Sequence, residues 1–129
     1  MQSYHPLSRV RADWQDDVLV LRVISGQMLD DRADDLRREI NTVLDGQKPG
    51  LVALDLSQVS MVSSMAVSVV ISLARRVRTE GGDVVLCGLT QFVNQVFRLC
   101  RLISDEKEQG IFRVYPDVDT AVAARKASD

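Results

Sequence analysis

The chain has few of the residues that build nucleophilic, metal and disulfide sites. Its 129 residues include one histidine, two cysteines and one tryptophan, and aromatic residues make up only 5% of the total. The single histidine, His5, leaves no Ser-His or Cys-His arrangement and no cluster with metal-ligand spacing. The glycines form no GxGxxG or phosphate-loop pattern. We therefore predict a protein that is not an enzyme and that uses no cofactor and no metal.

The cysteines and the lack of long apolar runs indicate a cellular location. Cys87 and Cys100 show no CxxC spacing, and Cys87 lies in an apolar run, so we expect two reduced packing residues rather than a disulfide. No uninterrupted apolar run is long enough to cross a bilayer, and residues 1–14 lack the apolar core of a signal peptide. These features favour a cytoplasmic protein with no direct membrane insertion.

No charge of one sign predominates. The chain has 16 basic and 18 acidic residues, scattered among one another, and a formal net charge of −2. This balance offers no electrostatic footprint for nucleic acid or anionic lipid. Asp30, Asp31, Asp34 and Asp35 lack the glycine turn of a cation loop and predict a solvated helix start. Protein partners, including a second copy of the chain, are therefore favoured over nucleic acid.

The length and the 46% hydrophobic content fit one globular α/β domain. We predict an N-terminal extension over residues 1–8, a domain over residues 9–126 and a C-terminal tail over residues 127–129. The apolar period predicts a mixed central sheet of about five strands with about four helices. Strands are expected at residues 9–14, 18–24, 51–56, 83–87 and 111–115. A first helix, which Asp30 or Asp31 could cap, is expected to run to residue 44. Further helices are expected at residues 64–79, 90–101 and 117–126.

Residues 64–79 fit two assignments. Val67, Val69, Val70 and Ile71 are β-branched and favour a strand. Sixteen residues without Gly or Pro, followed by two glycines, favour a helix with a glycine stop. Because a strand of that length would be unusual, we predict a helix.

In the next helix, at residues 90–101, the spacing places Phe92, Val96 and Leu99 on one side. We expect Phe92, Val96 and Phe97 to be core or near-core residues.

Ser63 and Ser64 begin the predicted second helix, after a buried strand and a short turn. Serine is a preferred N-cap residue, so we expect one of the pair to cap the helix and the other to lie in its first turn. The free amides and the dipole at a helix N-terminus also make phosphate tolerable there. Partner contacts in such sheets gather beyond the carboxyl ends of parallel strands, where this turn would lie.

The serine segment resembles the phosphoserine segment of the STAS domain, the fold of bacterial anti-sigma-factor antagonists. The usual family form is Leu-Asp-Leu-Ser-x-Val-x-x-Ile-Asp-Ser-Ser-Gly-Leu. This chain has Leu54-Asp55-Leu56-Ser57-Gln58-Val59-Ser60-Met61-Val62-Ser63-Ser64-Met65-Ala66-Val67. Weaker similarities at residues 18–30, 75–89, 93–102 and 114–117 extend the resemblance over about residues 9 to 126.

The resemblance implies an anti-sigma-factor antagonist in a partner-switching pathway that regulates sigma-dependent transcription. Its unphosphorylated form would bind a serine-kinase anti-sigma factor, and phosphorylation of Ser64 would prevent that binding. The predicted interaction surface comprises Ser60, Ser63, Met65, Ala66 and Val67, flanked by Gly26, Gln27, Met28 and Asp30.

Three positions depart from the family form and keep an alternative open. Ser63 replaces an aspartate, Ala66 replaces a glycine, and Met65 stands where a small hydroxyl residue is common. The alternative is a constitutive STAS scaffold or oligomer subunit that is never phosphorylated. A hydrolase using the serine pair as nucleophile is a third hypothesis, but it lacks a base.

The charged residues 104–110 are expected to form an exposed loop.

Overall fold

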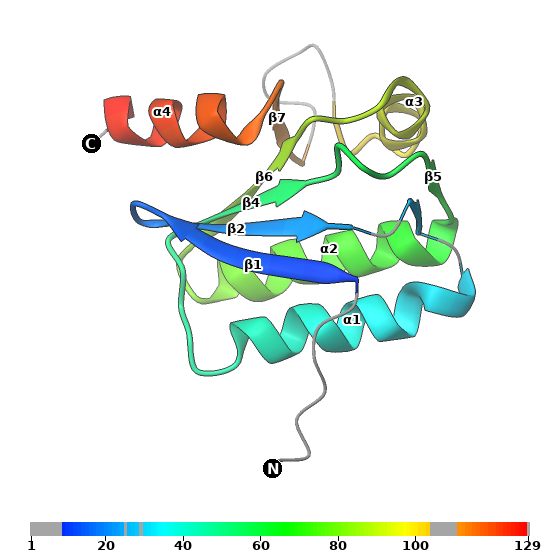
Figure 1. Cartoon of the computed structure of the whole chain (residues 1–129), viewed down its shortest axis with the longest axis horizontal. Helices are drawn as coiled ribbons and strands as arrows, with labels where there is room; N and C mark the ends of the chain where they lie inside the picture. The colour runs from blue at the N-terminus through cyan, green and yellow to red at the C-terminus, as the bar shows by residue number, and fades with distance from the viewer. Residues whose placement is uncertain (1–8, 25, 29, 104–110, 129) are drawn as a thin grey trace.

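The computed structural model describes residues 9–24, 26–28, 30–103 and 111–128. Two predicted segments, the extension at residues 1–8 and the loop at residues 104–110, lie outside the described residues. The domain itself is an α/β fold built on a mixed sheet, which confirms the predicted class (Figure 1).

The main sheet has five strands in the spatial order β1-β2-β4-β6-β7. They are β1 (Val10–Gln15), β2 (Val18–Val23), β4 (Leu51–Asp55), β6 (Asp83–Cys87) and β7 (Arg113–Tyr115). β1 and β2 form an antiparallel hairpin, and each later strand pairs in parallel with its neighbour. The turn of the hairpin holds Asp16 at φ 55°, a left-handed conformation that aspartate tolerates. β4 is the central strand and is buried along its whole length, as the apolar run predicts.

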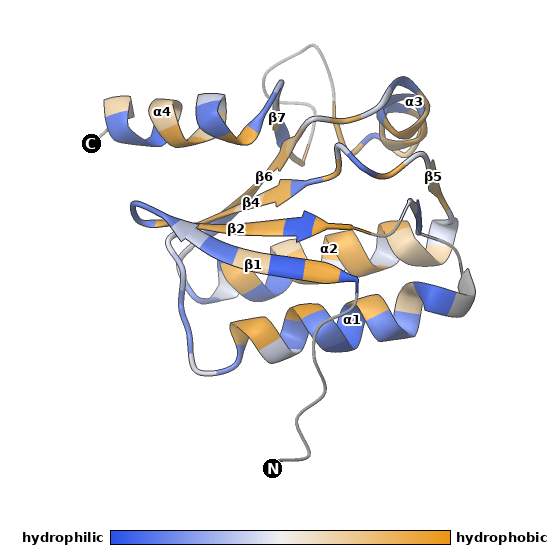
Figure 2. Cartoon of the chain, viewed as in Figure 1, coloured by the Kyte–Doolittle hydropathy of each residue, from blue (hydrophilic) through white to orange (hydrophobic). Residues whose placement is uncertain are grey.

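Helices cover both faces of this sheet. They are α1 (Asp30–Leu44), α2 (Ser64–Thr79), α3 (Gln91–Leu99) and α4 (Val118–Ser128). α1 and α2 lie side by side on one face, and α4 lies on the other (Figure 1). The larger apolar core fills the space between the sheet and α1, α2 and α3, and a smaller one lies under α4. In Figure 2 the central strands are largely apolar, whereas α1 alternates apolar and hydrophilic residues.

The helical assignment of residues 64–79 is confirmed with the predicted bounds. The β-branched residues that favoured a strand lie on the buried side of α2, with Val67, Val69 and Val70 in the core beneath the sheet. Burial of this apolar side outweighs their weak intrinsic preference, because tertiary packing routinely overrides propensity.

Glycines end α2, as predicted. Gly81 adopts φ 92°, and the Gly82 N–H donates to the Val77 carbonyl at 2.9 Å. A Cβ at Gly82 would lie 2.4 Å from the Pro49 carbonyl oxygen, so only glycine permits the helix end to pass this close to the entry of β4.

Several details differ from the predictions. On α3 the buried side chains are Val93 and Phe97, whereas Phe92 and Leu99 are exposed, by 48% and 84%. The buried side of α3 therefore differs from the predicted apolar side, and the prediction of Phe92 as a core residue is wrong. The helix is also shorter than the predicted residues 90–101. Cys100 is exposed rather than packed, although both cysteines are free as expected.

The remaining differences concern boundaries and two short strands. α1 begins at Asp30, so Asp30 and Asp31 belong to the helix instead of preceding it. α4 extends past Lys126 to Ser128. A second sheet, absent from the predictions, consists of β3 (Gln27–Met28) and β5 (Met61–Val62) in parallel.

Candidate functional site

The two serines at the start of α2 have different structural roles. Ser63 is the N-cap, with φ −95° and ψ 168°, and its Oγ accepts the Ala66 N–H at 3.2 Å. The Ser63 carbonyl accepts the Val67 N–H at 3.0 Å and so begins the helical hydrogen bonds. Ser64 is the first helical residue and is exposed. The predicted division of cap and first-turn residue is therefore confirmed.

The small second sheet joins the two chain segments of the predicted interaction surface. The Gly26 carbonyl accepts both the Ser60 N–H at 2.8 Å and the Ser60 Oγ–H at 2.9 Å. Directly beyond, Gln27 pairs with Met61 in the β3–β5 register. Figure 1 shows β5 beside the start of α2 and close to α3. Gly26 and Gln27 are thus held beside Ser60 and Met61, although more than thirty positions separate the two segments in the chain.

Only some of the predicted surface residues present side chains there. Met61 and Met65 are exposed by 45% and 43%, on either side of the exposed Ser64. Ala66 and Val67, by contrast, are buried in the core below α2. The side chains of Ala66 and Val67 thus support the helix from within, whereas Met61, which the sequence reasoning omitted, is exposed near Ser64. Its apolar side chain in an exposed turn was the available signal.

The turn between β4 and α2, which leads to Ser64, is also anchored on the side of α3. The Thr90 hydroxyl donates to the Val59 carbonyl at 3.0 Å, and Val59 is fully buried. The Val59 N–H in turn donates to the Leu56 carbonyl at 3.0 Å. These bonds hold the turn from both ends, so Ser64 projects from a well-supported backbone.

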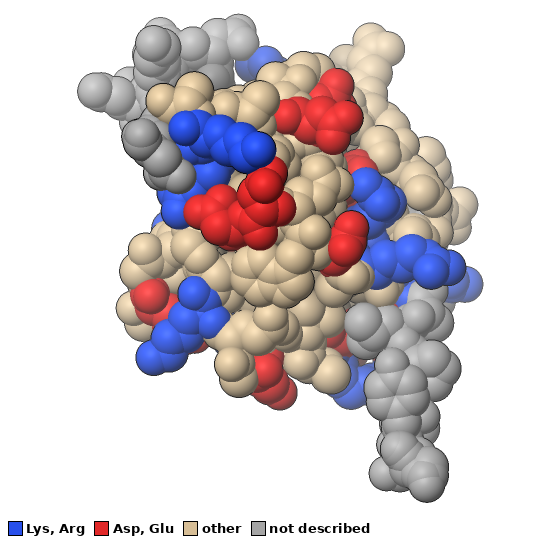
Figure 3. All heavy atoms as spheres, turned by 60° about the vertical axis from the view of Figure 1, so that its left-hand side comes forward, with Lys and Arg blue, Asp and Glu red and all other residues tan. Residues whose placement is uncertain are grey.

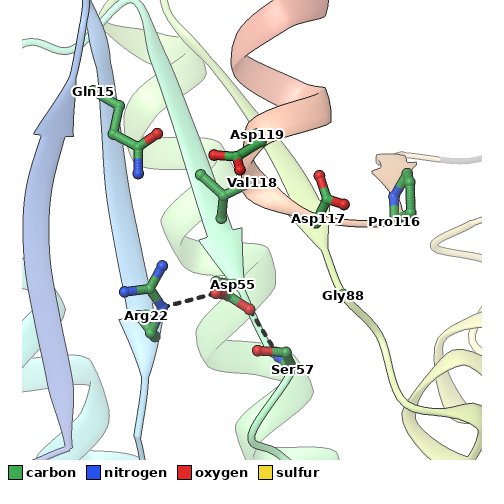
Figure 4. A pocket seen from close by; sticks show the side chains of 9 residues that line it. All are labelled: Gln15, Arg22, Asp55, Ser57, Gly88, Pro116, Asp117, Val118 and Asp119. Atoms are coloured by element: carbon green, nitrogen blue, oxygen red, sulfur yellow. Dashed lines mark hydrogen bonds and ion pairs between the residues drawn. The ribbon is translucent and has the colours of Figure 1, made fainter.

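A hollow of about 200 Å³ lies near this turn, at the carboxyl ends of the strands and beside the start of α4 (Figure 4). Its lining includes Arg22, Asp55, Ser57, Gly88 and Asp117. Gly88 adopts φ 69°, and a Cβ there would lie 3.0 Å from the Ser57 Cβ. The sequence reasoning did not predict this hollow, although a carboxylate and a guanidinium within two apolar strands were a signal.

Asp55 is the charged centre of the hollow. It is 7% exposed, and it accepts the Arg22 Nε–H at 2.8 Å and the Ser57 N–H at 2.9 Å (Figure 4). Burial by itself raises the pKa of this carboxyl, but the hydrogen bonds from Arg22 and Ser57 outweigh it and hold the pKa below its usual range. Asp55 is therefore charged, paired and engaged in fixing the start of the serine turn.

The described part of the chain presents no candidate metal cluster beside these residues. It contains no group of three or more His, Cys, Asp or Glu side chains that could hold a metal ion. Nor does it contain a helix long and apolar enough to cross a membrane. Figure 3 shows basic and acidic side chains interspersed over one face of the molecule, in agreement with the charge balance.

Comparison with known proteins agrees with this architecture. A relative from Bordetella bronchiseptica, named putative anti-sigma factor antagonist BtrV, is 29% identical over 113 residues, 87% of this chain and 90% of the relative. An anti-sigma factor antagonist from Mycobacterium paratuberculosis has a TM-score of 0.75 at 23% identity and covers 91% of this chain and 92% of its own. The phosphorylated form of SpoIIAA, a Bacillus cell fate determinant, has a TM-score of 0.66 at 14% identity, with 90% and 98% covered.

The two solved structures are similar to this chain in fold, that is, in the five-stranded sheet and its four helices. The family follows from the sequence profile of the STAS domain, which matches residues 9–121 from the first hairpin into α4. Since that match takes in nearly the whole described domain, the chain belongs to the STAS domain family.

Proposed function

We propose that this chain is a cytoplasmic anti-sigma-factor antagonist that binds a serine-kinase anti-sigma factor and loses that partner when Ser64 is phosphorylated. One observation carries the proposal: Ser64 is exposed in the first turn of α2, while Ser63 supplies the cap. The Ser64 hydroxyl is not needed for the cap, so a kinase can modify it without removing a bond that starts the helix.

The helix start is suited to carry the added charge. The Ala66 N–H is already taken by Ser63, but the amides of Ser64 and Met65 precede the first intrahelical bond. No acidic side chain lies in the first turn of α2. The free backbone amides and the helix dipole together stabilise an anion at such a position by about 0.3 to 1 kcal/mol. The domain is therefore expected to remain folded after modification.

The partner is expected to respond differently to the same charge. Met61 and Met65 offer exposed, adaptable apolar contacts next to Ser64. Phosphate adds about 1.5 to 2 negative charges, which a partner surface fitted to these methionines would have to desolvate. A penalty of only about 1.4 kcal/mol lowers affinity tenfold.

Two departures from the family form do not oppose this proposal. The methyl of Ala66 is fully buried, so it does not stand between Ser64 and a partner. Ser63 retains the capping function through its Oγ. The constitutive scaffold, without a switch, is the alternative that the experiments below distinguish.

Phosphorylation is tested by incubating the domain with ATP and a serine-kinase anti-sigma factor from the same genome, followed by intact-mass analysis. We expect one added phosphate on the wild type and none on Ser64→Ala. Ser63→Ala should still be modified, because its hydroxyl faces the helix backbone. An unmodified wild type, or the same modification in Ser64→Ala, would favour the constitutive scaffold.

Binding is tested by calorimetry with the same partner and with phosphoserine installed at position 64. We expect the phosphorylated chain to bind at least about tenfold more weakly than the unmodified chain. Phosphoserine at Ser72, exposed further along α2, is the matched control and should have little effect. Equal affinities for the chains with and without phosphate at position 64 would refute the switch.

A further inference from the structure

We propose that the free edge of β1 is a self-association surface, to which a second copy of this chain adds its own β1 in antiparallel orientation. β1 is the first strand in the spatial order, and within the described part of the chain it pairs only with β2. An edge strand presents unpaired N–H and C=O groups that another strand can bind. The opposite edge strand, β7, has only three residues against six in β1.

The register of the hairpin identifies the free backbone groups. The Ile24 N–H donates to the Arg9 carbonyl at 2.8 Å, and the antiparallel register pairs Arg11 with Arg22. Since hydrogen-bonded and non-bonded pairs alternate, Arg11 and Asp13 direct their backbone groups to β2. Ala12 and Trp14 therefore direct their N–H and C=O groups away from the sheet.

Glu39 of α1 closes the beginning of this edge. Its carboxylate, 8% exposed, accepts the outward N–H of Val10 at 3.2 Å and the N–H of Arg9 at 2.8 Å. The part of β1 that remains open to a second strand is centred on Ala12 and Trp14, both of which have exposed side chains.

The side-chain charges of β1 are complementary to those of a second, antiparallel β1 when the two strands are centred on Ala12. If a twofold axis passes through Ala12, the two Ala12 residues exchange backbone hydrogen bonds, and each Trp14 N–H reaches the Val10 carbonyl of the other copy. Arg11 of each copy then lies opposite Asp13 of the other, on the face of the sheet that carries α4. Val10 lies opposite Trp14 on the other face. Both contacts are favourable cross-strand pairs.

Within the part of one chain that the structure describes, Arg11 and Asp13 have no such partners. Arg11 lies opposite Arg22 in the hairpin, a like charge that is itself paired with Asp55. Among the described residues, neither Arg11 nor Asp13 forms an ion pair, whereas several other arginines do. A second β1 would supply the missing countercharge at both positions.

Other registers are less favourable. An axis through Asp13 would place two aspartates opposite each other, which is repulsive. An axis through Val10 would require the N–H that Glu39 occupies. An axis through Trp14 would carry the pairing past the end of β1 at Gln15. The arrangement centred on Ala12 is therefore the one that both the charges and the free backbone groups select.

The test is sedimentation velocity over a wide concentration range with a charge-swap cycle. We expect the wild type to dimerise, and Arg11→Asp or Asp13→Arg each to weaken the dimer at least about tenfold, because the twofold axis repeats every like-charge pair. The double variant Arg11→Asp/Asp13→Arg restores opposite charges and should dimerise like the wild type. Ser64→Ala, outside β1, should leave dimerisation unchanged.

Trp14 provides a second measurement, because it is the only tryptophan in the chain. Its emission should shift to shorter wavelength as the wild-type concentration rises, and the single charge variants should keep the spectrum of the monomer. Circular dichroism checks that each variant folds. A wild type that stays monomeric would overturn the proposal and assign Arg11 and Asp13 to protecting the edge. Dimerisation unaffected by both single variants would overturn it as well.

Discussion

Arg22 and Asp55 link the carboxyl ends of β2 and β4, with the Arg22 Nε–H donated to Asp55 Oδ2 over 2.8 Å. The other oxygen of the same carboxylate accepts the Ser57 N–H, so the ion pair also orients the first residue of the turn that leads to Ser64. Asp55 thus holds the turn that leads to Ser64, and its charge state bears on stability.

We expect Asp55→Asn to destabilise the domain by about 1 to 3 kcal/mol at neutral pH, because Arg22 and Ser57 lose a charged acceptor in a buried position. The pKa of Asp55 is lowered on folding, since hydrogen bonds to the carboxylate outweigh the opposing effect of burial. Its contribution is therefore present above the unfolded pKa of about 3.9 and is lost as pH falls through the folded pKa.

Urea denaturation at a series of pH values checks this expectation. The difference between wild type and Asp55→Asn should be constant near neutrality and should shrink as the pH falls below about 4. Asp34→Asn is the matched control, because Asp34 is exposed and its ion pair with Arg37 lies on the surface of α1. That control should cost less than about 1 kcal/mol. A difference that grows in acid would contradict the assignment.

Ser63→Ala is predicted to lower the free energy of unfolding by about 0.5 to 2 kcal/mol, because the Ala66 N–H loses its acceptor. Ser63→Asp should stay near the wild type, since aspartate also caps helices and its charge suits the helix N-terminus. Ser64→Ala should change stability by no more than about 0.5 kcal/mol, as expected for an exposed position without a cap bond. Chemical denaturation of the three variants distinguishes the serines, and equal losses at positions 63 and 64 would contradict their separate roles.

The two cysteines are predicted to differ in reactivity. Burial raises the pKa of the Cys87 thiol to about 12, and the negative charges of Asp55 and Asp117 add to this effect. Cys100 is exposed. Since the thiolate is the reactive form, iodoacetamide near pH 8 should modify Cys100 in the native protein and Cys87 only after unfolding. Intact-mass analysis before and after denaturation provides the measurement.

Cys100→Ser is the control for this experiment. The native variant should take up no label, whereas the unfolded variant should take up label at Cys87. Rapid native labelling of Cys100→Ser would mean that the strand β6 opens far more readily than its burial suggests.

Strong local patterns predicted most of the fold. The apolar runs of β2, β4 and β6 and the long segment of α2 between turn residues were sufficient for the order of elements, because each pattern reflects burial of a whole strand or helix side. The capped serine pair was predictable for the same reason, since the N-cap preference is a local property of the residue.

Other features depend on contacts between distant segments. The β3–β5 pair has two residues per strand, too few to produce a periodic pattern, and it forms because Gly26 and Ser60 meet across the turn. On α3, Phe92 and Phe97 are equally apolar, and only the neighbouring core decides that Phe97 is buried while Phe92 is exposed. The pairing of Arg22 with Asp55 likewise requires the parallel register of β2 and β4.

The amino-acid sequence by itself determined the fold class, the family and the presence of a hydroxyl at the start of the second helix. Those properties reside in residues close together in the chain, where hydrophobic period and capping chemistry act. The tertiary structure alone decided which side chains surround Ser64, that Ala66 is turned into the core, and that β1 lies at the edge of the sheet. Each of these depends on which surfaces the packed sheet and helices bury, and burial is a property of the assembled fold.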